Sequence, residues 1–183
     1  MTAIAVIPVN SPDDIIPLYR GTPFEELLAY HNLGKPQPET TGDARMLIVA
    51  CMDNRKELHI PPEFAYVIRT AGANVTDSEF SISYAIAVGG VRHIAVIAHT
   101  HCGMAHVDEK RDAVIAGLVN HAAWTHDDAA AHFDAHVAHY HVGDPAEFAL
   151  SESVRLDAMY PPIHIAPFLY SVEDDRLSIL LEG

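Results

Sequence analysis

The chain has 183 residues, of which 49% are hydrophobic, and 25 acidic residues against 11 basic ones give a formal net charge of −14. This length suits one domain with a sizeable core, so residues 1–183 are treated as a single unit. An acidic surface repels phosphate backbones and anionic lipid, which excludes nucleic acid and membranes as expected partners. No apolar run reaches the ~18 residues of a membrane span, and the first ten residues lack the cations of a signal peptide. We therefore expect a cytoplasmic protein.

The N-terminal residues 1–43 are predicted to form a helical arm followed by a loop. Thr22 can cap a helix that has Pro23 at its first position and Glu25 at its third. Residues 31–43 are rich in turn formers and polar side chains, which indicates a loop before an α/β body in residues 44–183.

The body alternates apolar runs with segments of helical spacing. Short continuous apolar runs predict buried strands at residues 46–50, 65–69 and 93–98. Helical spacing or helix-start signals predict helices at residues 77–88, 108–124, 127–141 and 145–159. Two further runs, 166–172 and 177–181, flank a polar turn and predict a terminal hairpin. The predicted fold is α/β: a mostly parallel sheet with helices on both faces and a C-terminal antiparallel hairpin.

Two cysteines and one histidine follow predicted strands directly. Cys51 ends the run at 46–50, and His99 and Cys102 follow the run at 93–98. Ligands bind at the carboxyl ends of parallel strands, and a Cys-His-Cys set suits tetrahedral zinc with one open, catalytic position. The alternatives are two small buried side chains or, less consistent with a reducing compartment, a disulfide.

Asp53 and Arg55 stand two residues apart just after Cys51, so that their side chains can point the same way. A guanidinium beside a carboxylate keeps it ionised and held in place. Asp53 could then accept a hydrogen bond from an activated water molecule. An ordinary surface ion pair is the alternative interpretation.

Three ordered motifs resemble the β-class carbonic anhydrases, especially their short bacterial and archaeal branch. They are Cys51-x-Asp53-x-Arg55, then Arg69-Thr70-Ala71-Gly72-Ala73, then His99-x-x-Cys102-Gly103. The resemblance implies a Rossmann-like fold and reversible hydration of carbon dioxide to bicarbonate through zinc-bound hydroxide. It further implies one zinc ion per chain on Cys51, His99 and Cys102, an Asp53–Arg55 catalytic dyad, and a homodimer or larger homo-oligomer with sites at the interface.

Two other functions are consistent with these motifs. Related enzymes on the same scaffold hydrolyse carbonyl sulfide or carbon disulfide, and a non-catalytic zinc-binding or bicarbonate-sensing protein is a second alternative. In some relatives the aspartate that corresponds to Asp53 occupies the fourth zinc position and closes the site.

Several histidines lie outside the predicted zinc ligands. His101 stands where close relatives often have aspartate, and it is a candidate proton shuttle or an exposed loop residue. His132, His136 and His139 share one predicted helix face. A second metal site is one interpretation of that face, and a solvated or interface surface is the favoured one. The core-facing stripe of this helix is predicted to be Ala130, Phe133, Val137 and Tyr140.

Overall fold

A six-stranded sheet forms the centre of the computed structural model, which describes residues 3–36, 42–55 and 58–183. The strands lie in the order β1-β6-β5-β4-β2-β3. Their bounds are β1 Ile4–Pro8, β2 Met46–Cys51, β3 Ala65–Thr70, β4 His93–His99, β5 His164–Ser171 and β6 Arg176–Glu182. The four strands β3, β2, β4 and β5 are parallel. At one edge β6 pairs antiparallel with β5, and β1 pairs antiparallel with β6. The predicted α/β sheet with a terminal antiparallel hairpin is confirmed.

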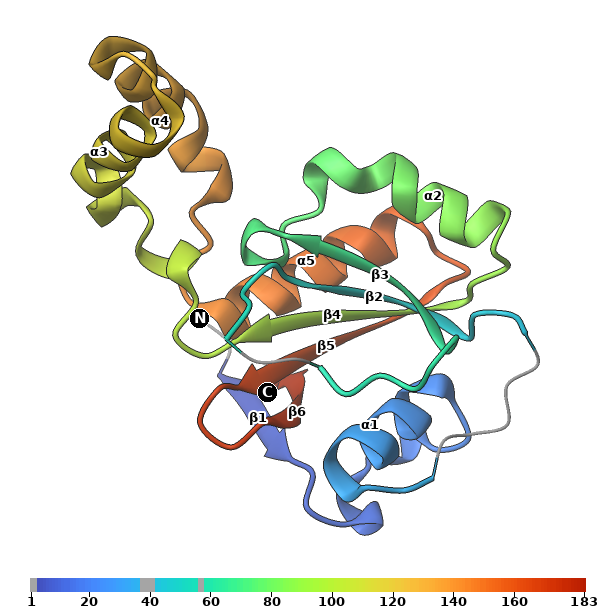
Figure 1. Ribbon diagram of the computed structural model, residues 1–183. Coiled ribbons are helices and arrows are strands. Elements are labelled where there is room, and N and C mark those ends of the chain that lie inside the picture. The colour runs from blue at the N-terminus through green and yellow to red at the C-terminus, as the bar shows by residue number, and fades with distance from the viewer. Residues whose placement is uncertain (1–2, 37–41, 56–57) are drawn as a thin grey trace.

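Helices cover both faces of this sheet (Figure 1), as the sequence predicts. On one face lies α1 Pro23–Leu33, and on the other lie α2 Glu79–Ala87 and α5 Pro145–Met159. The described residues also form α3 Arg111–Ala122 and α4 His126–Tyr140. Short 3-10 turns precede α1 at Pro12–Asp14 and Pro17–Tyr19, and others lie between the later elements at Ala71–Ala73, Thr76–Ser78, Gly103–His106 and Asp108–Lys110. The predicted cap of α1 is confirmed, since the Thr22 hydroxyl accepts a hydrogen bond from the Phe24 amide at 3.2 Å.

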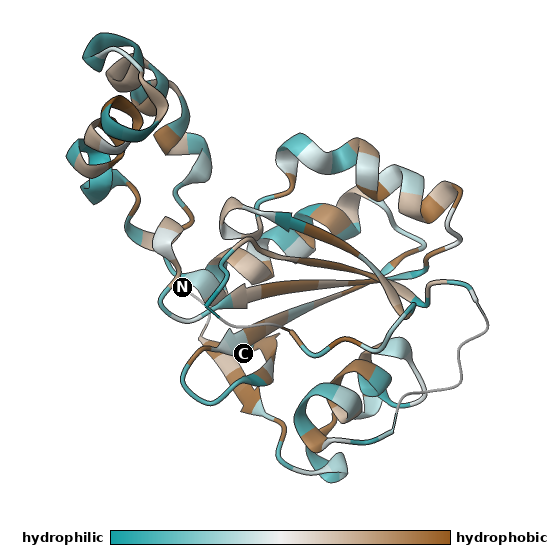
Figure 2. Ribbon diagram, viewed as in Figure 1, coloured by the Kyte–Doolittle hydropathy of each residue, from teal (hydrophilic) through white to brown (hydrophobic). Residues whose placement is uncertain are grey.

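Strand β2 shows why the sheet is sandwiched between helices. All six of its residues are buried. Its alternate side chains divide between two apolar clusters, with Ile48 packing in the cluster that includes Leu27 of α1. Val49 belongs to the other cluster, which includes Ile82 of α2 and Leu156 of α5. A continuous apolar run is therefore required here, and Figure 2 shows the central strands as the most hydrophobic part of the ribbon.

The N-terminal segment departs from the prediction of an arm made only of helix and loop. Residues 4–8 form β1, which pairs antiparallel with β6 and extends the sheet. Helix α1 also runs into the predicted loop 31–43, and Gly34 ends it at φ 61°. Residues 37–41 of that loop lie outside the described residues.

The helices α3 and α4 form a hairpin that projects away from the sheet (Figure 1). They match the predicted helices 108–124 and 127–141, apart from a 3-10 turn that replaces the first residues of the former. In α4 the buried residues are Ala129 and Phe133, whereas Ala130, Val137 and Tyr140 of the predicted stripe are only half-buried. Within the described part of the chain, no helix has the length and apolar character needed to cross a bilayer.

Candidate metal centre

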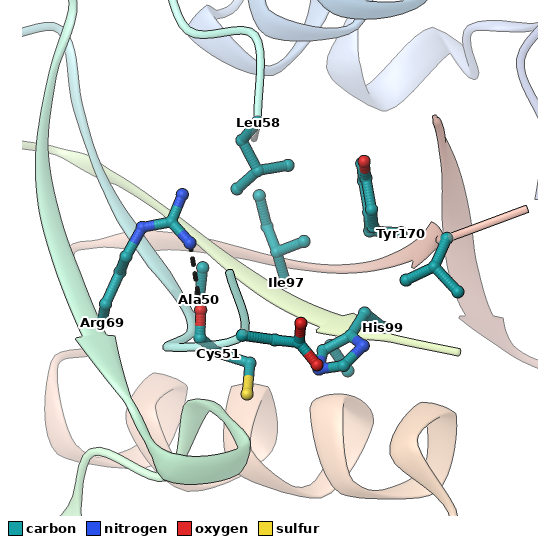
Figure 3. Close-up of a pocket in the computed structure, with 10 residues that line it drawn as sticks. Ala50, Cys51, Leu58, Arg69, Ile97, His99 and Tyr170 are labelled. Carbon is teal, nitrogen blue, oxygen red and sulfur yellow. Dashed lines mark hydrogen bonds and ion pairs between the residues drawn. The ribbon is translucent and has the colours of Figure 1, made fainter. Parts of the chain in front are cut away.

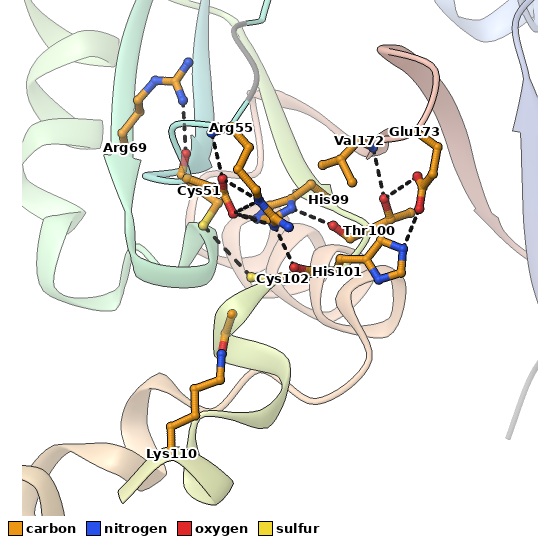
Figure 4. Close-up of polar contacts among 12 residues, drawn as sticks. Cys51, Arg55, Arg69, His99, Thr100, His101, Cys102, Lys110, Val172 and Glu173 are labelled. Atoms are coloured by element: carbon orange, nitrogen blue, oxygen red, sulfur yellow. Dashed lines mark hydrogen bonds and ion pairs between the residues drawn. The ribbon is translucent and has the colours of Figure 1, made fainter. Parts of the chain in front are cut away.

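Adjacent parallel strands bring the predicted ligands together. Strands β2 and β4 pair in register up to Ala50 and Ile97, and they end at Cys51 and His99. Cys102 lies in the turn that follows β4. The three ligand atoms all lie within 4.8 Å of one another, and Cys51, His99 and Cys102 are 9%, 6% and 6% exposed respectively. This cluster of three residues is called the metal centre below (Figure 4).

The histidine of the metal centre is oriented by its neighbour. The Nδ1 atom of His99 lies 2.8 Å from the Thr100 carbonyl oxygen, which can only accept, so Nδ1 carries the proton. The Nε2 atom then presents its lone pair toward the cysteines. This Nε2 is buried and has no hydrogen-bond partner. A buried nitrogen without a partner is costly, and a metal ion would supply that partner.

The two thiols complete a donor set that fits a soft or borderline cation. Their Sγ atoms are 4.0 Å apart and both cysteines are free, so the disulfide interpretation is wrong for this structure. The contact between the two thiols lowers the pKa of Cys51, because a hydrogen bond from Cys102 stabilises the Cys51 thiolate. The thiolate is the form of cysteine that binds zinc.

The predicted pair of Asp53 and Arg55 is formed at the rim of the metal centre. The Arg55 guanidinium donates to both carboxylate oxygens, with Nε to Oδ1 at 2.9 Å and Nη2 to Oδ2 at 2.6 Å. This pairing lowers the pKa of Asp53 to about 2. The Arg55 Nη2 also donates to the carbonyl oxygen of His101 at 2.7 Å, which ties the pair to the β4 turn. The Asp53 Oδ2 atom lies 3.8 Å from His99 Nε2.

The side chain of His101 turns toward Glu173 in the β5–β6 turn rather than toward Cys51 (Figure 4). Its Nε2 lies 2.5 Å from Glu173 Oε1, and 69% of its side chain is exposed. Glu173 also accepts hydrogen bonds from the hydroxyls of Thr100 and Ser171 at 2.8 and 3.0 Å. The ring therefore stands between the metal-centre loop and solvent, and its role as a proton shuttle stays a prediction.

A small cavity opens beside the metal centre on the α1 side of the sheet. Its volume is about 30 Å³, and Figure 3 shows Arg69 and Tyr170 flanking it with Cys51 and His99 at one end. Asp53 and apolar side chains complete the lining, which includes Leu58, Ile97 and Val172. Sequence reasoning did not single out Tyr170 or Val172 as site residues. Both lie at the carboxyl end of β5, and this position could have identified them as site residues. Leu58 lies in a loop with no motif, so the sequence gives no indication of its role.

The segment after β3 passes very close to the metal centre. Gly72 has a φ of 67°, and a Cβ there would lie 2.6 Å from Val142 Cγ1 and 3.2 Å from Met104 Cβ. Val142 packs in turn against Cys51 and Cys102. Only glycine combines this backbone conformation with this approach, which gives a physical reason for the glycine of the Arg69–Ala73 motif.

Comparison with known proteins agrees with this geometry. A family model described as carbonic anhydrase matches residues 46–159. A carbon disulfide hydrolase of Saccharolobus solfataricus is 43% identical over 67 residues, which are 34% of this chain. The match spans about a third of that curated relative's length, at 33%.

Two solved structures resemble a larger part of the chain than this curated relative does. A carbon disulfide hydrolase in its apo form is 28% identical, covers 74% of this chain and 77% of its own, and has a TM-score of 0.54. A β-carbonic anhydrase of Trichomonas vaginalis has a TM-score of 0.64 and covers 82% and 91%, with 20% identity. The second likeness establishes the fold alone.

Substituting Gly72 by alanine should destabilise the protein more than the same change at Gly143. Gly143 has a φ of 60° and no atom within 4 Å of the position that a Cβ would take, so Gly143→Ala adds only backbone strain of about 1–2 kcal/mol. Gly72→Ala adds a collision with Val142 and Met104, which should cost about 1–3 kcal/mol more. Urea denaturation of both variants measures the difference. Equal losses of unfolding free energy would show that Gly72 is not constrained by the packing around it.

Proposed function

Because the chain belongs to the β-class carbonic anhydrase family, we propose that it is a zinc enzyme that reversibly hydrates carbon dioxide to bicarbonate. Enzymes of this family use zinc, and the donor set of the metal centre fits that ion. We propose Cys51, His99 and Cys102 as its ligands. The observation that carries the proposal is the buried, unpartnered Nε2 of His99 beside two thiols and an ionised Asp53.

When bound, zinc supplies the positive charge that makes a water molecule acidic enough to act as a nucleophile. The protein side chains then have three tasks. Asp53, kept ionised by Arg55, accepts a hydrogen bond from the attacking water and so orients it. Arg55 holds that carboxylate in place through its second bond to the His101 carbonyl. Arg69 lines the same cavity, where its charge favours an anionic product.

The cavity beside the metal centre is small, with a volume of about 30 Å³, and this supports a small substrate. The apolar side chains of Leu58, Ile97 and Val172 match a substrate with no net charge. Carbon dioxide fits this description, and carbon disulfide is the larger of the two molecules because sulfur is larger than oxygen.

Carbon disulfide hydrolysis is the second candidate function. The relative from Saccharolobus solfataricus that carries this activity in its name is 43% identical over its matched segment. The same donor set and the same Asp53–Arg55 pair would serve attack on the carbon of either molecule. Carbonyl sulfide, with one oxygen and one sulfur, is intermediate in size between the two.

Both substrates should be tested on the zinc-loaded protein, by stopped-flow hydration of carbon dioxide and by sulfide release from carbon disulfide. We expect hydration of carbon dioxide to be the faster reaction. Asp53→Asn should retain zinc and lower turnover by about 100-fold, because an amide cannot replace the ionised acceptor. Asp157→Asn, an exposed change on α5, is the matched control. Faster sulfide release would favour the second candidate, and full activity of Asp53→Asn would remove Asp53 from the mechanism.

We further propose that two copies of the chain associate through the free edge of the sheet. Strand β3 ends the sheet order and exposes Tyr66 and Val67, which are 41% and 44% exposed. The neighbouring α2 and the residue that ends it expose Phe80, Tyr84 and Val88, at 85%, 53% and 67%. An unpaired strand edge beside large exposed apolar side chains is typical of a protein interface.

A single charge placed in this apolar surface should therefore break the dimer. Phe80→Glu buries an unpaired carboxylate at the interface and should yield the mass of a monomer. Leu18→Glu is the matched control, because Leu18 is 76% exposed but lies in the Pro17–Tyr19 turn far along the chain from β3. Light scattering after size exclusion measures both. An unchanged mass for Phe80→Glu would locate the interface elsewhere.

A further inference from the structure

The α3–α4 hairpin carries histidines that the metal centre does not use. They include His121, His126, His132, His136 and His139. The hairpin projects from the sheet (Figure 1), so these side chains are not needed to build the core. Two of them, His132 and His136, lie close enough together to bind one metal ion.

His132 and His136 stand one helical turn apart on α4, and both are exposed. Their ring centroids lie 4.4 Å apart. The Nδ1 of His136 lies 2.8 Å from the His132 carbonyl oxygen, so Nδ1 must be the donor. The Nε2 of the neutral ring is then left with a free lone pair. Metal-binding histidines typically donate their second nitrogen to a carbonyl in this way.

His139 does not join this pair, although the sequence places it on the same face. Its Nε2 lies 3.1 Å from Asp77 Oδ2, in the segment that precedes α2. Its backbone carbonyl accepts a hydrogen bond from the Asn74 side chain at 2.8 Å. His139 therefore connects the base of the α3–α4 hairpin to the segment that precedes α2. This leaves His132 and His136 as the two candidate ligands.

The helix beneath the pair is held firmly. The Trp124 and His132 rings pack edge to face, with ring centroids 5.1 Å apart. Arg111 of α3 donates to both carboxylate oxygens of Asp134 of α4, at 2.9 and 2.8 Å. Phe133, between the two histidines, is buried. Two imidazoles on a fixed helical turn lose little freedom when they chelate one ion.

We propose that His132 and His136 form a second metal site, which takes a divalent transition metal of borderline softness such as nickel, copper or zinc. Imidazole suits these ions, whereas calcium and magnesium require oxygen ligands. Among the described residues, the metal centre is the one group of three or more such donors that lie close together. The second site therefore has two protein ligands, and water fills the other positions, so bound metal exchanges readily.

Trp124 provides a direct reporter, because it is the single tryptophan of the chain and it contacts His132. The zinc-loaded protein is titrated with Ni²⁺ while the tryptophan fluorescence and the bound zinc are measured. A paramagnetic ion held by His132 lies beside the indole and quenches it. We expect saturable quenching with one Ni²⁺ per chain and with the zinc of the metal centre retained.

Single substitutions identify the ligands. His132→Ala and His136→Ala should each weaken Ni²⁺ binding by about 100-fold, because each removes one arm of the chelate. His126→Ala is the matched control, since His126 is an exposed histidine at the start of α4 that pairs only weakly with Asp127, at 3.6 Å. Isothermal titration calorimetry measures the Ni²⁺ affinities without using tryptophan fluorescence. A substitution that alters the fluorescence of Trp124 is therefore not mistaken for a change in affinity.

Three results would overturn this proposal. They are the absence of saturable Ni²⁺ binding, equal affinity in His132→Ala, His136→Ala and the unsubstituted protein, and loss of one zinc for each nickel bound. Circular dichroism checks that each variant keeps its helices. The test is independent of the reaction at the metal centre, because it measures metal binding and not turnover.

Discussion

The parallel pairing of β2 with β4 determines where the side chains of the metal centre lie. Both strands are parallel and adjacent, so their carboxyl ends reach the same edge of the sheet. Cys51 and His99 end these strands, and the turn after β4 returns Cys102 to within 4.0 Å of the first thiol. The strands keep this register because apolar layers hold them from both faces. Three donors are thus fixed before any ion binds, which lowers the entropic cost of binding it.

The polar rim depends on the same edge. Arg55 joins Asp53 to the His101 carbonyl, so the segment after β2 and the turn after β4 are connected by one guanidinium. Gly72, in the segment after β3, lets Val142 approach the two cysteines. Val142 follows the α3–α4 hairpin in the chain, and this contact links the base of the hairpin to the metal centre. The site is therefore assembled from the ends of three strands and one remote segment.

The fold could be predicted where hydrophobic patterning was strong. The continuous apolar run of β2 required burial on both faces, and the turn before Arg176 predicted the terminal hairpin. Strand β1 was missed because Ile4–Pro8 has little buried surface of its own. It forms only by pairing with β6, at the opposite end of the chain, and a local pattern carries no information on such a partner. The projection of α3 and α4 away from the sheet is likewise a tertiary property.

The residues of the metal centre could be proposed because strand ends converge in parallel sheets, and the structure brings Cys51, His99 and Cys102 together. The cavity could be predicted only in part, since Tyr170 lies at the carboxyl end of β5 but Leu58 reaches the cavity from a loop that carries no motif. The orientation of the His101 ring could not be predicted from the sequence either, because it depends on a contact with Glu173 in another turn. The candidate ligands at the strand ends can therefore be predicted from the sequence. The residues that line the cavity depend on tertiary packing, which the sequence pattern does not show.

We propose that two thiolates and one imidazole hold zinc at this edge of the sheet. X-ray absorption spectroscopy at the zinc edge, on protein loaded with one equivalent of the metal, identifies the atoms that surround the ion. We expect two sulfur neighbours at about 2.3 Å and at least one nitrogen at about 2.0–2.1 Å. A zinc ion surrounded only by nitrogen and oxygen, or with a single sulfur neighbour, would contradict this proposal.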